Sequence, residues 1–212
     1  MRWSFQLPCW LRLFYRDAVW RKPSSARCVY LTFDDGPVPE VTPQVLDILD
    51  RYNVKATFFW VGENVARYPD LAREVVRRGH SVGNHTYNHL AGWGRPLGMY
   101  ADNILKAEKA MDDAGVKRDR KLFRPPYGKA GLQKHDWLRG QGYTVVLWDI
   151  ITHDYNPRYT PAQIERAVLR YVRNGSVILF HDSIKASANM LQSLPEVISA
   201  LQQSGWSFGI IE

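Results

Sequence analysis

Short apolar runs alternate with helical patterns along the chain from residue 28 onward. Runs rich in β-branched and aromatic residues predict strands over 28–33, 56–61, 80–83, 121–123, 144–150, 176–180 and 206–211. Apolar residues at helical spacing, with start and stop signals such as Thr42-Pro43 and Gly79, predict helices over 42–52, 70–78, 99–114, 132–139, 161–173 and 189–203. This alternation implies an α/β fold with about seven parallel strands, either open and doubly wound or closed into a barrel.

Length and composition favour a single domain. The chain has 212 residues, of which 45% are hydrophobic and 23% are charged, as in ordinary soluble proteins. Two domains of this total length would each be small, and the sequence contains no internal repeat, low-complexity tract or linker. We therefore predict a basic, aromatic segment over residues 1–26 and one domain over residues 27–212.

The segment before the first strand holds three tryptophans and five Arg or Lys residues within residues 1–23. A proline at position 8 and charged residues at 12, 16 and 17 interrupt its apolar stretches, so we predict neither a cleavable signal peptide nor a membrane span. We expect its aromatic residues to pack on the domain, with an interfacial membrane helix as the alternative. The lack of an export signal predicts a cytoplasmic protein, with peripheral contact at the inner membrane face under that alternative.

The net charge of +7 raises the question of an anionic partner. Basic residues are scattered, however, and the densest groups are short runs such as VKRDRK at 116–121. No basic helix or nucleic-acid-binding motif is present, so we predict no nucleic-acid partner. The charge then serves solubility and non-specific attraction.

Cys9 and Cys28 show neither metal-ligand spacing nor a disulfide framework. Free thiols in a reducing compartment are the simplest interpretation, although a single disulfide between them stays open.

Polar residues gather where the predicted strands end, which is where α/β folds place their chemistry. Asp34 and Asp35 follow the first run and precede Gly36-Pro37. Two carboxylates about 5 Å apart repel by about 3 kcal/mol at an effective dielectric constant near 20, so their adjacency requires a reason. An ordinary turn before Gly-Pro is the simple alternative.

The other strand ends supply partners for these carboxylates. After the run at 80–83 come His85 and His89, whose spacing of four residues lets both imidazoles face one cation. With one aspartate they form a set of two histidines and one carboxylate, and the second aspartate can then act as a base. Further polar ends are Arg124–Gly128, Asp149–Tyr155 and His181-Asp182, and no glycine-rich phosphate loop is present.

The motifs TFDDGP, HTYNH, RPPYG, WDIITHDY and LFH resemble, in order and spacing, those of the NodB-like polysaccharide deacetylases, carbohydrate esterase family 4. The resemblance covers about residues 27–212 and implies a distorted (β/α) barrel with about seven strands. It also implies that Asp35, His85 and His89 hold a divalent metal. Asp34 would be the general base, supported by Arg124.

The same resemblance assigns the remaining roles. His181 would be the general acid, partnered by Asp154, and the backbone N–H of Tyr127 would help to bind the oxyanion. Leu179 would line the acetyl pocket, and Pro125 and Tyr127 would contact the substrate. The metal would be zinc, and cobalt, nickel, manganese and iron are compatible with the same ligands.

Two positions depart from the family pattern, and both concern the groove. Ile151 stands where the family usually has Asp, and Tyr155 stands where it usually has Trp. Neither change removes a catalytic group, but both weaken inference about the substrate. Tyr155 and Trp93 are candidate surfaces for sugar stacking, with simple loop packing as the alternative for Trp93.

The resemblance implies an enzyme that removes N-acetyl groups from an acetylated amino sugar or polysaccharide and releases acetate. We expect the protein to be a monomer. The same site could cleave another small amide or a carbamoyl group. Two histidines and one carboxylate also bind iron in non-haem oxygenases, but those sites need neither a second aspartate nor a paired acid histidine. An inactive carbohydrate-binding protein is a third alternative, against which the complete set of catalytic residues argues.

Overall fold

The computed structural model describes residues 5–6, 15 and 17–212. Its strands are β1 (Cys28–Asp34), β2 (Thr57–Trp60), β3 (Ser81–Asn84), β4 (Leu122–Phe123), β5 (Thr144–Val145), β6 (Ile150–Ile151), β7 (Val177–His181) and β8 (Ser207–Phe208). Its α-helices are α1 (Thr42–Arg51), α2 (Gly62–Arg67), α3 (Pro69–Arg77), α4 (Leu97–Asp113), α5 (Leu132–Gly140), α6 (Pro161–Tyr171) and α7 (Ile184–Gln203). A 3₁₀ turn, η2, spans Pro126–Gly128.

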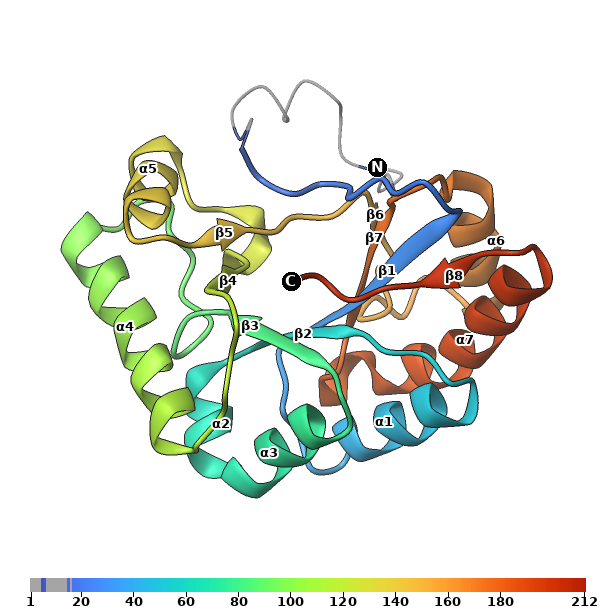
Figure 1. The fold of residues 1–212 in the computed structure, drawn as a ribbon, viewed down its shortest axis with the longest axis horizontal. Coiled ribbons are helices and arrows are strands. Elements are labelled where there is room, and N and C mark those ends of the chain that lie inside the picture. Colours follow the sequence, from blue (N-terminus) through green and yellow to red (C-terminus); the bar gives the residue numbers. More distant parts are fainter. Residues whose placement is uncertain (1–4, 7–14, 16) are drawn as a thin grey trace.

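Seven parallel strands form one curled sheet in the order β5-β4-β3-β2-β1-β7-β6, and β8 pairs in parallel with the start of β1. The helices form an arc around this sheet, with the C-terminal end of the chain near its centre (Figure 1). The predicted α/β class, a distorted barrel with about seven parallel strands, is therefore confirmed. The sheet is a half-barrel, since no pairing joins β5 to β6 in the described part of the chain.

The central position of β1 explains its sequence. Its residues from Val29 to Asp34 are all buried, as expected for a parallel strand that is covered on both faces. Phe33 stacks against Phe58 of β2 and Phe180 of β7, with ring centroids 5.0 and 5.9 Å apart. This packing fixes the end of β1, and with it Asp34, between its two neighbouring strands.

The predicted strand over 144–150 is wrong as one element. The chain forms β5 at one edge of the sheet and β6 at the other, and residues 146–149 cross between them. Of residues 144–150, all except Thr144 are buried. A continuous run of buried residues has the same apolar sequence pattern whether it belongs to one strand or to two.

Two helices also differ from prediction. Helix α2 was not predicted, because it is only six residues long and has no side-chain cap. Helix α7 begins at Ile184, five residues before the predicted start, and continues through Pro195.

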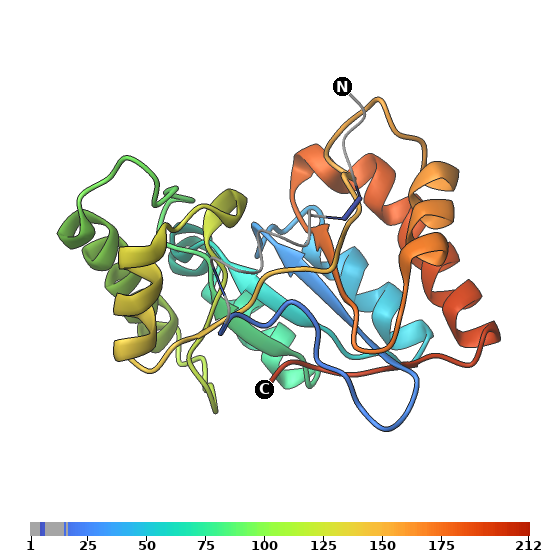
Figure 2. The ribbon, with the colours of Figure 1, turned by 90° about the horizontal axis from the view of Figure 1, so that it is seen from above.

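The segment that precedes β1 fills the space between the two edges of the sheet. The Val19 N–H donates to the carbonyl of Val145 at 2.8 Å, and the Leu147 N–H donates to the carbonyl of Val19 at 2.8 Å. The Lys22 N–H donates to the carbonyl of Gly175 at 2.9 Å. In the ribbon seen from above, this segment runs across the open side of the sheet (Figure 2).

Packing on the domain is thus what the structure shows for this part of the segment, with Tyr15 and Trp20 both buried. Trp3, Trp10 and Phe14 lie outside the described residues, so their packing on the domain stays a prediction, with membrane contact as the alternative. Cys28 carries a free thiol, and Cys9 also lies outside the described residues. No helix in the described part of the chain is long and apolar enough to span a bilayer.

Candidate active site

A cleft of about 630 Å³ opens at the carboxyl ends of the central strands. It is lined by Gln6, Asp34, Asp35, His85, His89, Tyr127, Lys129, Trp148, Ile151, His153, Tyr155, Leu179, His181 and Lys185. Asp34 and Asp35 come from the end of β1, the histidine pair follows β3, and His181 ends β7. Because β3 and β7 lie on opposite sides of β1, the cleft has two chemically different walls.

Asp35, His85 and His89 form a cluster at the centre of the cleft. Asp35 Oδ1 lies 3.3 Å from His89 Nε2 and 3.8 Å from His85 Nε2. One ligand atom from each residue can be chosen so that all three lie within 4.8 Å of one another. Asp35 Oδ1 is buried and has no hydrogen-bond partner among the described residues. A buried carboxylate oxygen without a donor, beside two imidazole nitrogens, matches the donor set of a divalent cation.

The orientation of His85 is fixed by the backbone behind it. Its Nδ1 lies 2.6 Å from the carbonyl oxygen of Arg124, so Nδ1 carries the proton and Nε2 presents its lone pair to the cluster. Burial lowers the pKa of His85 to about 3, and the neighbouring His89 adds to the effect. The ring is therefore neutral over the working pH range, as a metal ligand must be.

Asp34 faces a different set of partners. Its Oδ1 accepts a hydrogen bond from Arg124 at 2.6 Å, and both side chains are almost fully buried. The guanidinium also donates to Thr32 Oγ1 and to the carbonyls of Val146 and Leu147, and it lies 4.1 Å from the ring centre of Phe59. The guanidinium is thus held in place by four hydrogen bonds, and the one to Asp34 joins two opposite charges. Asp34 Oδ2, 3.7 Å from His85 Nε2, stays close to the cluster.

His181 and Asp154 form the pair on the opposite wall. His181 Nδ1 lies 2.8 Å from Asp154 Oδ1, and the His181 N–H donates to Asp154 Oδ2 at 2.8 Å. Burial alone would lower the pKa of His181, but the carboxylate of Asp154, with smaller contributions from Asp35 and Asp34, raises the pKa to about 9. The imidazole is therefore protonated at neutral pH, with Nε2 free to donate into the cleft.

The turn that carries Tyr127 supplies a backbone donor. Pro125 and Pro126 have no N–H, and the N–H groups of Gly128 and Lys129 donate back to the carbonyls of these two prolines. Tyr127 has a left-handed backbone with φ of 58°, and no acceptor is found for its N–H in the part of the chain that the structure describes. Its ring contacts His89 edge-on at 4.7 Å.

The four predicted substrate contacts other than Tyr127 separate into two groups. Leu179 and Tyr155 line the cleft, and Tyr155 packs edge-on against His181 with ring centroids 5.0 Å apart. Pro125 and Trp93 are not among the lining residues. Pro125 is buried, and Trp93 is 61% exposed, with its ring centre 5.6 Å from Nζ of the cleft residue Lys129.

Asp182 is a residue whose importance the sequence reasoning did not recognise. Its two carboxylate oxygens accept hydrogen bonds from the Gly36 N–H at 3.0 Å and from Thr42 Oγ1 at 2.7 Å. Burial and the nearby Asp35 raise its pKa, against the effect of these donors. A Cβ at Gly36 would lie 2.0 Å from Asp182 Oδ2, so only glycine fits there. Asp182 thus holds the turn that presents Asp35, and its place directly after His181 was the available signal.

The segment before β1 also reaches the cleft, which was not predicted. The carbonyl of Phe5 accepts a hydrogen bond from the Ile151 N–H at 2.9 Å, and its ring packs edge-on against His153 at 5.4 Å. Gln6 lies among the lining residues. The wall at Ile151 and Tyr155, where the sequence departs from the family pattern, is therefore built partly by residues that precede the first strand.

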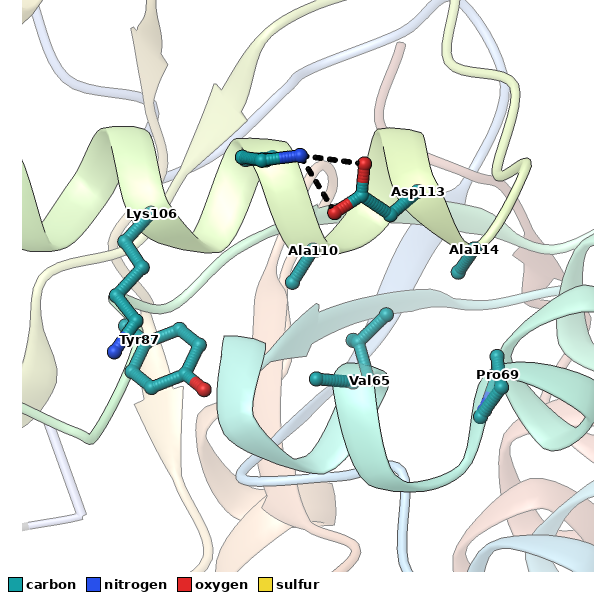
Figure 3. A pocket seen from close by; sticks show the side chains of 9 residues that line it. Val65, Pro69, Tyr87, Lys106, Ala110, Asp113 and Ala114 are labelled. Atoms are coloured by element: carbon teal, nitrogen blue, oxygen red, sulfur yellow. Dashed lines mark hydrogen bonds and ion pairs between the residues drawn. The ribbon is translucent and has the colours of Figure 1, made fainter.

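A second groove, of about 370 Å³, lies between α2 and α4 (Figure 3). Its polar residues are few: Lys109 pairs with Asp113 at 2.8 Å, and Lys106 Nζ lies 3.8 Å from the ring centre of Tyr87. Among its described lining residues there is no cluster of metal ligands like the one in the cleft.

Comparisons with known proteins agree with this arrangement. A sequence model of the family described as polysaccharide deacetylase matches residues 21–146. A peptidoglycan-N-acetylglucosamine deacetylase of Bacillus cereus is 33% identical over 194 residues, which cover 90% of this chain and 89% of the relative. A chitooligosaccharide deacetylase of Sinorhizobium fredii is 38% identical over 173 residues, which cover 81% of this chain and 79% of the relative.

A solved structure shares the whole fold. The crystal structure of a peptidoglycan N-acetylglucosamine deacetylase superposes with a TM-score of 0.88 and 31% sequence identity, covering 97% of this chain and 95% of that one. The family match, the identity to these relatives and the shared fold all lead to one assignment. This chain belongs to the polysaccharide deacetylases, the NodB-like enzymes of carbohydrate esterase family 4.

Proposed function

We propose that the protein is a metal-dependent hydrolase that removes N-acetyl groups from an amino sugar in a glycan and releases acetate and a free amine. The observation that supports it best is the division of the cleft. Asp34, held by Arg124, lies with the Asp35–His85–His89 cluster on one side. The charged His181–Asp154 pair lies at β7, on the other side of β1.

The cluster fits a resident cation. Asp35 Oδ1 lacks a hydrogen-bond donor among the described residues, and both neighbouring imidazoles can present Nε2 to the same point. Two imidazoles and one carboxylate suit zinc, which we propose as the ion, and cobalt, nickel, manganese and iron accept the same donors. When bound, such a cation supplies Lewis acidity that polarises the amide carbonyl and makes water a better nucleophile.

The protein's own residues divide the proton transfers between the two walls. Asp34, held in position by its hydrogen bond from Arg124, takes the proton of the attacking water. The Tyr127 N–H stabilises the negative charge that develops on the carbonyl oxygen. The nitrogen leaves as an amine only if it is protonated, and His181, kept charged by Asp154, donates that proton. Leu179 and Trp148 provide an apolar surface for the acetyl methyl group.

Acetate release tests this function directly. Protein stripped of metal should release no acetate from N-acetylglucosamine oligomers, and protein reloaded with zinc should recover activity. His85→Ala and His89→Ala should lose bound metal, whereas His135→Gln, a buried histidine on α5 outside the cleft, should retain it. Full activity of stripped protein, or stoichiometric metal in both alanine variants, would contradict the proposal.

The rival chemistries find less support. An iron oxygenase would give no task to Asp34 with Arg124 or to His181 with Asp154, and its usual β-rich jelly roll differs from this parallel sheet. An inactive binding protein would not need these buried charges. Cleavage of another small amide or a carbamoyl group would use the same residues, so the acetate assay should include those substrates.

A further inference from the structure

Two lysines of the cleft take no part in the proposed reaction. Lys129 follows the Tyr127 turn, and Lys185 lies in the first turn of α7. Both side chains are exposed, and neither makes an ion pair with the residues that the structure describes. Such free ammonium groups inside a substrate cleft are available to a ligand.

A tyrosine ring lies between each lysine and a histidine of the proposed site. The two lysines lie on opposite sides of the centre of the cleft. On one side, Tyr127 contacts His89 at 4.7 Å, and Lys129 Nζ lies 6.0 Å from the Tyr127 ring centre. On the other side, Tyr155 contacts His181 at 5.0 Å, and Lys185 Nζ lies 5.4 Å from the Tyr155 ring centre. Both ammonium groups are therefore placed for sugars next to the acetylated one, not for its acetamido group.

The charges of the cleft do not cancel these two cations. Asp34 is paired with Arg124, and Asp154 is paired with His181. Asp35 is the remaining carboxylate among the lining residues, and it faces the two histidines. A cation bound there would make the loaded cleft more positive still. A concave site with one sign of charge attracts ligands of the opposite sign.

We propose that Lys129 and Lys185 bind anionic groups on the sugars that flank the acetylated one, so that the enzyme prefers an acidic glycan to a neutral one. The inference rests on the proposed function, whose substrate it narrows. A carboxylate on the sugar and a phosphate ester offer the same chemistry to an ammonium group. The simple alternative is that both lysines only cover the aromatic rings beneath them.

Matched substrates test the preference. The metal-loaded protein is given a neutral N-acetylglucosamine oligomer, an oligomer in which N-acetylglucosamine alternates with its carboxylate-bearing derivative N-acetylmuramic acid, and an N-acetylglucosamine oligomer that carries a phosphate ester. The ratio of kcat/KM for an acidic oligomer to that for the neutral one should exceed one at low salt and fall as salt is added. The acidic oligomer with the larger ratio identifies the anion.

Variants assign the preference to the two lysines. Lys129→Gln and Lys185→Gln should each lower the ratio roughly threefold to tenfold, mainly through KM, and the double variant should bring it close to one. Lys106→Gln is the matched control, because Lys106 also lies over a tyrosine ring but in the groove of Figure 3. Its ratio should equal that of the unaltered protein.

Two failures can be told apart. A ratio near one in the unaltered protein, or an unchanged ratio in the double variant, would overturn the role of the lysines while leaving the deacetylase intact. If no glycan releases acetate, the proposed function fails. Calorimetric measurement of binding of the same oligomers then tests whether the two lysines bind anionic groups. Tighter binding of an acidic oligomer that the double variant loses would support the lysines, and equal binding of all three would refute them.

Discussion

Asp34 and Asp35 are neighbours in sequence, yet their carboxylates have separate surroundings. Asp34 ends β1 with its side chain on the buried guanidinium of Arg124. Asp35 has a left-handed backbone, with φ of 83°, and its carboxylate faces the two histidines. The turn conformation that separates them is held by Asp182 through the Gly36 N–H. The repulsion expected between the pair is therefore offset at Asp34 by the guanidinium of Arg124, and at Asp35 it would be offset by the proposed cation.

This separation predicts two distinct phenotypes. Asp34→Asn should retain bound metal but lower kcat by about two to four orders of magnitude, the usual cost of removing a general base. Asp35→Asn should instead weaken metal binding, because its carboxylate is the charged member of the cluster. Metal content by elemental analysis and kcat by acetate release check both, and reversed phenotypes would mean that the two roles are exchanged.

The His181–Asp154 pair predicts how activity depends on pH. His181 acts as an acid, so kcat should fall as the pH rises through its pKa, which Asp154 raises to about 9. In Asp154→Asn the raising carboxylate is gone and burial remains, so the pKa falls and the alkaline limb should move to lower pH by about one to two pH units. If the alkaline limb of the kcat–pH profile does not move in this variant, Asp154 does not set the pKa of the general acid.

At the scale of elements, the sequence predicts those helices and strands whose signals lie within their own residues. Strand β1 and helix α6, with its Thr160–Gln163 capping box, carry their signals locally. The metal cluster could be proposed because HTYNH and the aspartate pair each lie within a short motif. The division of 144–150 could not be predicted, because which edge each half joins depends on β4 and β7. The same holds for Phe5 and Gln6, whose contact with the cleft depends on β6 and the loop that follows it.

Close packing between β3 and its neighbours predicts a contrast between two glycines. A Cβ at Gly83 would lie 2.7 Å from two ring atoms of Phe59 and 2.9 Å from Leu122 Cβ, so Gly83→Ala should destabilise the protein by about 1–3 kcal/mol. A Cβ at Gly98, in the first turn of α4, would meet nothing within 4 Å, so Gly98→Ala should stabilise it by about 0.5–1 kcal/mol. Urea denaturation measures the free energy of unfolding of both variants. Equal effects would show that β3 and its neighbours can shift to accommodate the added methyl group.

For the whole molecule, the segment before β1 joins the two edges of the sheet and anchors Trp20 in the core. Trp20→Ala should lower the free energy of unfolding by about 3–5 kcal/mol, because its side chain is 7% exposed. Trp93→Ala is the matched control, since Trp93 is 61% exposed and should change stability by less than about 0.5 kcal/mol. Denaturant titration compares them, and a small loss at Trp20 would mean that the segment contributes little to the fold.

The same pairing has a consequence for the order in which the protein assembles. Val19 bonds to residues 145 and 147, and Lys22 bonds to Gly175, so this early stretch of the chain docks on parts that leave the ribosome much later. Contacts between residues so far apart in sequence form slowly, because the intervening chain must be ordered first. Until then β5 and β6 have exposed edges, which can pair with other chains. The stretch that is synthesised before β1 is therefore expected to be among the last to settle, and its arrival pairs Val19 with Val145 of β5 and Phe5 with Ile151 of β6.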